Sequence, residues 1–133
     1  MIGIGSDILD IRRIEKTFQK YGDRFKRKIF TDNEVNRCDN RPNQIACYAK
    51  RFAAKEAASK ALGTGFRKGI FWKDLEVINL PSGKPTLKFH GNSLRLLKLL
   101  MAFEETPNIN LSISDEYPYA QAIVIISSTN KKV

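Results

Sequence analysis

An alanine-rich segment from Gln44 to Leu62 constrains the fold of this 133-residue chain more than any other feature. The segment contains no glycine or proline, and alanine has the highest intrinsic helix propensity, so it predicts a long helix. Gly63 follows directly, and a glycine in this position is typical of a helix C-terminus. The small side chains of this helix leave open space beside Glu56, a carboxylate in its interior.

Shorter segments on both sides of this helix alternate between strand-like and helix-like patterns, without repeats or linkers. A capping-box pattern from Thr31 to Glu34 indicates a helix start, and a turn at 81–85 joins two alternating segments into a hairpin. The predicted elements are a strand at 1–6, helices at about 8–21, 31–39 and 44–62, strands within 71–80 and at 86–90, a helix at 92–105, and strands at 110–115 and 119–127. Helices mixed with hairpins predict a single α+β domain over residues 1–133. Its mainly antiparallel sheet is expected to pack against the long helix and the shorter helices.

The amino-acid composition and length exclude several classes of protein. The length favours one domain, and hydrophobic (42%) and charged (28%) residues occur in ordinary globular proportions, which excludes collagen-like and disordered chains. The longest apolar run is far shorter than the ~18 residues that a membrane span needs. No basic region precedes the apolar N-terminus, which Asp7 interrupts, so we expect no secretory signal. These features predict a soluble, cytoplasmic protein that does not bind membranes.

The chain has two cysteines, Cys38 and Cys47, and one histidine, His90. Two cysteines cannot form a disulfide scaffold, so we expect two ordinary thiols in a reducing compartment. Together with one histidine they also cannot form a metal cluster. We expect His90, which lies at the end of a predicted strand, to have a structural role rather than to activate a nucleophile.

Positive charge is concentrated near the N-terminus. The net charge is +9, and eight basic residues between Arg12 and Lys28 are accompanied by only two acidic ones, a local charge of +6. Four of the basic residues recur at helical spacing and are expected to share one helix face: Arg13, Lys16, Lys20 and Arg24. Such a face is either simply solvated or docks an acidic helix. Nucleic-acid binding is an alternative, but the chain lacks basic strands interleaved with aromatic residues and any recognition motif.

Two carboxylates each have two interpretations. Asp7 stands where the first strand gives way to a helix, so it either caps that helix or presents a carboxylate to a metal or substrate. Glu56 either forms an i,i+4 ion pair with Lys60, which contributes only ~0.2–0.5 kcal/mol, or holds a divalent metal beside a phosphate site. The cations that would neutralise phosphoryl oxygens there are Arg51, Lys55 and Lys60. A protein that only docks acidic helices would leave both carboxylates without a role.

The turn Gly63-Thr64-Gly65 directly follows the long helix. It does not fit the Walker pattern GxxxxGK[ST], because the lysine, Lys60, precedes the glycines. A Gly-x-Gly turn can nevertheless expose backbone N–H groups to a phosphate. The alternative is a simple helix cap, which is the usual role of glycines at this place.

Taken together, these segments resemble one family over nearly the whole chain. The segments are GIGSDI from Gly3, RFAAKEAASKALGTG from Arg51, GKP at 83–85, SISD from Ser112 and YAQA from Tyr119. In order and spacing they resemble the holo-acyl-carrier-protein synthases, the short bacterial members of the 4′-phosphopantetheinyl transferase superfamily. The resemblance implies the fold of that superfamily and a role in fatty acid biosynthesis. It also implies a reaction that moves the 4′-phosphopantetheine arm of coenzyme A onto a serine of apo acyl carrier protein and releases adenosine 3′,5′-bisphosphate.

The resemblance also implies roles for individual residues. Asp7 and Glu56 match two carboxylates that bind Mg²⁺, and Lys60 matches a lysine beside the coenzyme A pyrophosphate. These three are the implied catalytic residues, with Lys60 a proton acceptor or a stabiliser of the leaving group. Arg51 and the Gly63-Thr64-Gly65 turn match contacts with coenzyme A phosphates.

One site residue departs from the common family pattern. Asp115 stands where many relatives have histidine and some have aspartate, so the resemblance places it at coenzyme A without supplying a catalytic imidazole. An acidic group beside the 3′-phosphate of coenzyme A would need another cation.

The family's carrier protein is strongly acidic, so the resemblance gives the basic N-terminal segment a partner. The implied contacts are Arg13, Lys20 and Arg24. The resemblance further implies a homotrimer whose sites lie between neighbouring subunits, and no partnership with nucleic acid.

Overall fold

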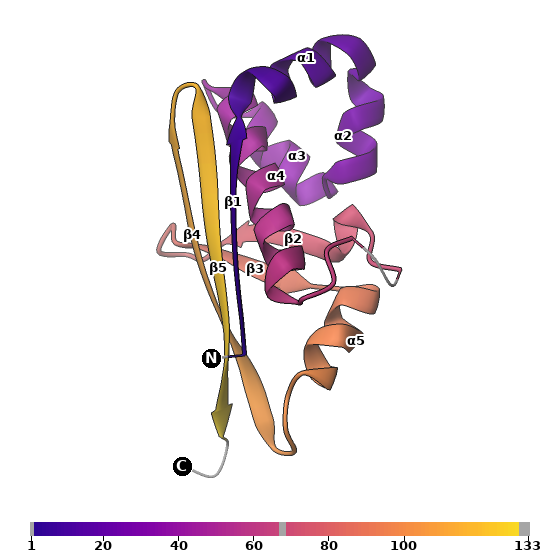
Figure 1. Ribbon diagram of the computed structural model, residues 1–133. Coiled ribbons are helices and arrows are strands. Elements are labelled where there is room, and N and C mark those ends of the chain that lie inside the picture. The colour runs from indigo at the N-terminus through magenta and orange to yellow at the C-terminus, as the bar shows by residue number, and fades with distance from the viewer. Residues whose placement is uncertain (1, 67–68, 131–133) are drawn as a thin grey trace.

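The computed structural model describes residues 2–66 and 69–130, and its elements surround a long central helix (Figure 1). In chain order the elements are β1 (Gly3–Asp10), α1 (Ile11–Tyr21), α2 (Asp23–Ile29), α3 (Asp32–Asp39), α4 (Gln44–Ala61), the 3₁₀ turn η1 (Trp72–Asp74), β2 (Leu75–Asn79), β3 (Pro85–Phe89), α5 (Gly91–Leu99), β4 (Glu105–Glu116) and β5 (Tyr119–Asn130). None of the helices in these residues combines the length and the apolar character that crossing a membrane requires.

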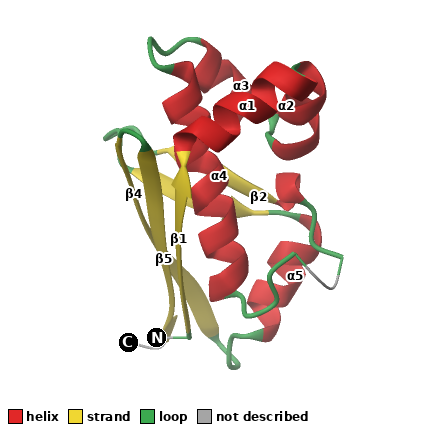
Figure 2. Ribbon diagram, turned by 45° about the horizontal axis from the view of Figure 1, so that its top comes forward, coloured by secondary structure: helices red, strands yellow, loops and turns green. Residues whose placement is uncertain are grey.

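The strands form two antiparallel sheets. A long sheet has the order β1-β5-β4, and β2 and β3 form a separate hairpin. The helices lie on one side of the long sheet, with α4 running along it (Figure 2). The α+β class and the antiparallel pairing are confirmed, although the strands divide between two sheets instead of one.

β1 lies directly against α4 because glycines leave no side chain between them. A Cβ atom at Gly3 would lie 2.0 Å from the carbonyl oxygen of Ala61, and one at Gly5 would lie 1.9 Å from that of Ala57. Any other residue would overlap the helix backbone at these positions. The buried alanines on this part of α4 complete the close approach: Ala53, Ala54, Ala57, Ala58 and Ala61.

A buried ion pair ties α4 to α3 and β2. The Lys55 Nζ lies 2.7 Å from the Glu34 Oε1 and donates to the Leu75 carbonyl at 2.6 Å, and both charged side chains are fully buried. Glu34 also accepts the backbone N–H groups of Thr31 and Val77, each at 2.9 Å, and so completes the predicted capping box. Burial lowers the pKa of Lys55, and the negative charge of Glu34 opposes that shift.

The predicted junction between the first strand and the first helix is wrong by several residues. β1 continues through Asp7 to Asp10, and the Asp10 side chain accepts the backbone N–H of Arg12 at the start of α1. Asp10 is therefore the N-cap of α1. The interpretation of Asp7 as a helix cap is excluded.

Two further boundaries differ from the sequence prediction. The basic segment forms two helices, because Gly22 has a φ of 54° and ends α1 before α2 begins at Asp23. Arg24 therefore lies on a different helix from Arg13 and Lys20, and the four predicted basic residues do not share a single helix face. α5 ends at Leu99, short of the predicted helix end at 105. β4 begins at Glu105 and pairs with β5 along its whole length, so residue 105 belongs to the sheet and not to the helix.

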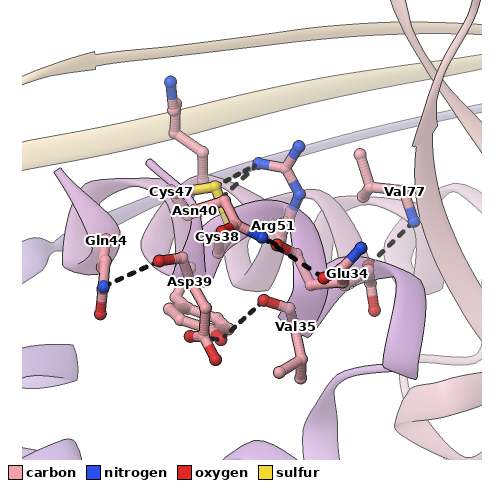
Figure 3. The surroundings of a disulfide bond; sticks show 12 residues. Glu34, Val35, Cys38, Asp39, Asn40, Gln44, Cys47, Arg51 and Val77 are labelled. Atoms are coloured by element: carbon pink, nitrogen blue, oxygen red, sulfur yellow. Dashed lines mark hydrogen bonds between the residues drawn. A yellow bond between two sulfur atoms is a disulfide. The ribbon is translucent and has the colours of Figure 1, made fainter. Parts of the chain in front are cut away.

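The two cysteines form a disulfide, so the expectation of two ordinary thiols is wrong (Figure 3). Cys38 lies in the last turn of α3 and Cys47 in the first turn of α4, and their Cα atoms are 5.4 Å apart. The intervening turn at 40–43, which contains Pro42, reverses the chain and brings the two helix ends together.

Candidate functional site

Asp7 of β1 and Glu56 of α4 line one cavity of about 310 Å³. Side chains alternate along a strand, so Asp7 lies on the same face of β1 as Gly3 and Gly5, the face that packs against α4. The close approach that the glycines permit thus places the Asp7 carboxylate beside the helix. Other residues that line this cavity include Arg13, Ile14, Phe25 and Phe52.

Lys60 of α4 forms an ion pair with Asp7, and we call Asp7, Glu56 and Lys60 the carboxylate site. The Lys60 Nζ donates to the Asp7 Oδ1 at 3.1 Å and to the Ser6 carbonyl at 3.0 Å. Burial raises the pKa of Glu56, and the negative charge of Asp7 raises it further while Lys60 opposes the shift. The two carboxylates are therefore close enough to repel each other, although they are far apart in the sequence.

The carboxylate site fits a divalent cation. A dication would relieve the repulsion between Asp7 and Glu56, and both offer the hard oxygen ligands that Mg²⁺ prefers. In the part of the chain that the structure describes, no group of three or more His, Cys, Asp or Glu side chains is placed to hold a metal. The remaining ligands would have to be oxygen atoms of water or substrate, which is typical of Mg²⁺ beside phosphates.

A second cavity, which we call the cationic cavity, lies between α3, α4 and the strands and has a volume of about 530 Å³. Its charged lining residues are Arg37, Arg41, Lys50, Arg51 and Asp115. Four cations and one acid make this cavity suited to a polyanion with several phosphate groups. Sequence analysis did not assign Arg37, Arg41 or Lys50 to a site. The four-residue spacing of Arg37 and Arg41 was the available sequence signal for this cavity. That spacing does not show that α3 lies next to α4.

Arg51 is the most buried cation of the cationic cavity, with 3% of its surface exposed. Its Nη1 donates to the Cys47 carbonyl at 3.2 Å and contacts the Cys47 Sγ at 3.1 Å, and its Nη2 donates to Asn79 at 3.2 Å. The Nε is buried and has no hydrogen-bond partner. Burial and the neighbouring Arg37 lower the pKa of Arg51. A buried donor without a partner in a cation-rich cavity indicates a place for an anion.

Asp115 forms an ion pair with Lys50 across the cationic cavity, with the Asp115 Oδ1 3.2 Å from the Lys50 Nζ. Lys50 thus supplies the cation that we expected an acid beside a phosphate to need. Asp115 also lines an adjoining cavity at the β4–β5 turn, together with Ile8 of β1.

The Gly63-Thr64-Gly65 turn ends α4 and lies at the opposite end of the helix from the cationic cavity. The Gly63 N–H donates to the Lys60 carbonyl at 2.9 Å, and the Gly65 N–H donates to the Ser59 carbonyl at 3.1 Å. Both glycines have positive φ angles, 83° and 59°. These two N–H groups cap the helix in this structure, so the turn has the capping role that the sequence left as an alternative.

The predicted carrier-binding residues lie on two helices and do not share one cavity. Arg13 lines the same cavity as Asp7 and Glu56, whereas Arg24 lines a different cavity of about 400 Å³ between α1 and α2. The Lys20 Nζ lies 5.2 Å from the centroid of the Tyr21 ring near the end of α1. Of the three, Arg13 is the one that the fold brings to the carboxylate site.

The structure therefore assembles the predicted residues into separate groups around α4. Positions 51 and 56 are five residues apart, about 140° around an ideal helix, so Arg51 and Glu56 face different cavities. Asp115 joins Arg51, and Asp7 joins Glu56. A long ligand with several phosphates could use both groups only by extending around the helix or by bridging two copies of the chain.

Comparison with known sequences identifies the family. A family model described as the 4′-phosphopantetheinyl transferase superfamily matches residues 3–120. The chain belongs to this superfamily. A holo-[acyl-carrier-protein] synthase of Rhizobium leguminosarum bv. trifolii is 55% identical over 128 residues, which is 96% of each chain. One of Caulobacter vibrioides is 51% identical over 132 residues, which is 99% of each chain.

Solved structures show the same fold. The holo-[acyl-carrier-protein] synthase of Neisseria meningitidis aligns with a TM-score of 0.82 at 32% identity, covering 96% of this chain and 98% of that chain. The Helicobacter pylori enzyme, in complex with coenzyme A, aligns with a TM-score of 0.78 at 28% identity, covering 93% of this chain and 99% of that chain.

Proposed function

We propose that this chain is an enzyme that transfers the 4′-phosphopantetheine group of coenzyme A to a serine of an apo acyl carrier protein and releases adenosine 3′,5′-bisphosphate. The proposal depends above all on the carboxylate site, in which Asp7 and Glu56 face one cavity and Lys60 binds Asp7. The relatives named above as holo-[acyl-carrier-protein] synthases support the same reaction. As the family resemblance implies, we place the reaction in the cytoplasm and in fatty acid biosynthesis.

Asp7 and Glu56 are the residues that would hold Mg²⁺. When bound, Mg²⁺ supplies a Lewis acid that draws negative charge from the diphosphate of coenzyme A. Lys60, whose ammonium group already donates to Asp7, adds a further positive charge for the phosphate that leaves. Transfer of a phosphoryl-linked group needs mainly such positioning and charge neutralisation.

The transfer itself exchanges one P–O bond for another. The carrier serine oxygen attacks the β-phosphorus of coenzyme A, and the bond from that phosphorus to the bridging oxygen breaks. The bridging oxygen leaves with adenosine 3′,5′-bisphosphate. The serine proton passes to a base at the carboxylate site, either a carboxylate or Lys60.

We assign the 3′-phosphate of coenzyme A to the cationic cavity. The buried and unpartnered Nε of Arg51 supports this assignment, as do the positive charges of Arg37 and Arg41. Asp115, held by Lys50, would border the same phosphate. The Gly63-Thr64-Gly65 turn stays a proposed second contact with the phosphates of coenzyme A, in which Thr64 would approach the coenzyme.

We further propose that the chain forms a homotrimer with its sites between subunits. Ile4 and Ile8 alternate with the β1 residues that face α4, so they lie on the outer face of the long sheet, and they are 56% and 65% exposed. Ile123 and Ile125 of β5 lie on the same face, because they pair directly with β1 residues of that face. Burying this apolar face against another copy would remove it from water. Light scattering should give a mass of about 45 kDa, three times the 15.1 kDa of one chain, and a monomer mass would contradict the trimer.

Arg13→Glu should weaken binding of the carrier protein about tenfold while changing coenzyme A binding by less than about threefold. Arg13 is exposed beside the carboxylate site, where the acidic carrier must present its serine, whereas the 3′-phosphate of coenzyme A is assigned to another side of α4. Fluorescence anisotropy with a labelled apo carrier, and calorimetry with coenzyme A, measure the two affinities. Lys98→Glu, on the exposed side of α5, makes the same charge change away from both sites and should affect neither. Equal losses for both ligands would exclude the proposed role of Arg13.

The proposed reaction is tested by mass spectrometry of the carrier. Purified protein, Mg²⁺, coenzyme A and an apo carrier protein should give a carrier that is heavier by one phosphopantetheinyl group. A carrier that a known transferase can modify, but that this protein leaves unchanged, would exclude the proposed activity.

A further inference from the structure

The disulfide between Cys38 and Cys47 (Figure 3) lies beside the cationic cavity, because Cys47 is one of the residues that line it. Cys38 is fully buried, whereas Cys47 is 6% exposed and is one of the residues that line the cavity. A small thiol that enters the cavity would therefore reach the Cys47 sulfur first. The proposed reaction gives this bond no role.

The surroundings of Cys47 favour a negative charge on its sulfur. The Arg51 Nη1 lies 3.1 Å from the Cys47 Sγ, and Cys47 belongs to the first turn of the 18-residue helix α4, where the helix dipole is positive. The other charged groups that face the cavity are Arg37, Arg41, Lys50 and Asp115, and Asp115 is already paired with Lys50. A free thiol here would lose its proton more readily than an ordinary cysteine, because a thiolate is stabilised by nearby cations and by helix N-termini.

We propose that the Cys38–Cys47 pair is a redox switch that sets the affinity of the cationic cavity for phosphates. In the disulfide form the Cys47 sulfur is neutral, and Arg51 can direct its positive charge at a bound anion. In the reduced form Cys47 is a thiolate that forms an ion pair with Arg51, and this pair withdraws the cation from the ligand and adds a negative charge to the wall. The proposal rests on the assignment of the 3′-phosphate of coenzyme A to this cavity.

The chemistry of the switch is a thiol–disulfide exchange with a small dithiol as the reductant. One thiolate of the dithiol attacks the Cys47 sulfur, the S–S bond breaks, and Cys38 leaves as a thiolate that takes up a proton. The second thiol of the reagent then loses its proton and attacks the reagent sulfur that is bonded to Cys47. This step closes the reagent's ring and releases Cys47 as a thiolate. The reagent ends as a cyclic disulfide, and the protein ends with two reduced cysteines.

Calorimetric titration of the oxidised and the dithiol-reduced protein with adenosine 3′,5′-bisphosphate tests the switch. Reduction should weaken binding about tenfold at pH 8, where an activated thiol is ionised. Two variants separate the charge on Cys47 from the loss of the covalent link. Cys38→Ser leaves a free Cys47 and should bind as weakly as the reduced protein, whether or not a reductant is present. Cys47→Ser has neither a link nor a thiolate and should bind as tightly as the oxidised protein.

Two results would overturn the switch. Equal affinities of the oxidised and reduced wild-type protein would exclude any redox effect, and this comparison needs no variant to fold. Weak binding by both serine variants would show that the covalent link matters and that the thiolate does not. A parallel titration with inorganic pyrophosphate separates the switch from the proposed function. If pyrophosphate binding depends on the redox state while neither form binds the nucleotide, the switch holds and the assignment of coenzyme A to this cavity fails.

Discussion

Glu56→Gln should lower the rate of transfer by about 100-fold or more, which corresponds to roughly 2.7 kcal/mol of lost transition-state stabilisation. Glutamine has nearly the same shape, but it cannot bind a dication as a carboxylate does. The rate is read from the mass of the carrier over time. Glu15→Gln, on the exposed side of α1, makes the same chemical change outside the site and should keep the wild-type rate.

The same substitution should not destabilise the fold. The folded state raises the pKa of Glu56 above its ordinary value of 4.5, so ionised Glu56 reduces stability. In the wild-type protein this loss of stability appears as the pH rises from 4.5 through the raised pKa of Glu56. Glu56→Gln removes the ionisable group and therefore the loss of stability. The variant should therefore be at least as stable as the wild type at pH 8, by urea unfolding. A variant that unfolds more easily at pH 8, or that transfers at the wild-type rate, would contradict the placement of Glu56 in the carboxylate site.

Lys55→Met should destabilise the protein by about 3–5 kcal/mol, because it leaves the fully buried Glu34 without its cation. It also leaves the Leu75 carbonyl without the Lys55 donor. For a chain of this size we expect a fall in melting temperature of roughly 10–20 °C. Differential scanning calorimetry measures it directly.

A matched control for Lys55→Met is Lys98→Met, because Lys98 is exposed on α5. It removes the same charge from the surface and should change the melting temperature by less than about 2 °C. If both substitutions have the same small effect, Lys55 does not form the buried ion pair with Glu34, and the contact between α3, α4 and β2 is wrong.

Sequence patterns predicted those helices and strands whose formation depends on residues that are neighbours in the sequence. The alanine-rich run predicted α4, the Thr31–Glu34 capping box predicted the start of α3, and the turn at 81–85 predicted the β2–β3 hairpin. The helix α2 was missed because Phe25 and Ile29, its two buried apolar residues, lie among basic residues that hide the short stripe. The end of β1 was misplaced because Asp7 and Asp10 are equally good N-caps in sequence, and only pairing with β5 extends the strand to Asp10.

The candidate site was predicted in part because its residues have unusual chemistry and match a family pattern. Asp7, Glu56 and Lys60 do lie together, although the ion pair joins Lys60 to the strand residue Asp7. The cationic cavity could not be predicted, because it exists only when α3, α4 and β4 come together. The cysteine pair was missed for the same reason, since a sequence separation of nine residues says nothing about how the helices α3 and α4 are placed.

The dependence of the transfer rate on Mg²⁺ tests most directly whether the two carboxylates act together on a dication. We predict a rate that rises with Mg²⁺ and saturates for the wild-type protein, is abolished by a chelator and returns when Mg²⁺ is restored. A carrier that gains its phosphopantetheinyl group at the same rate with a chelator as with saturating Mg²⁺ would contradict the proposed role of Asp7 and Glu56.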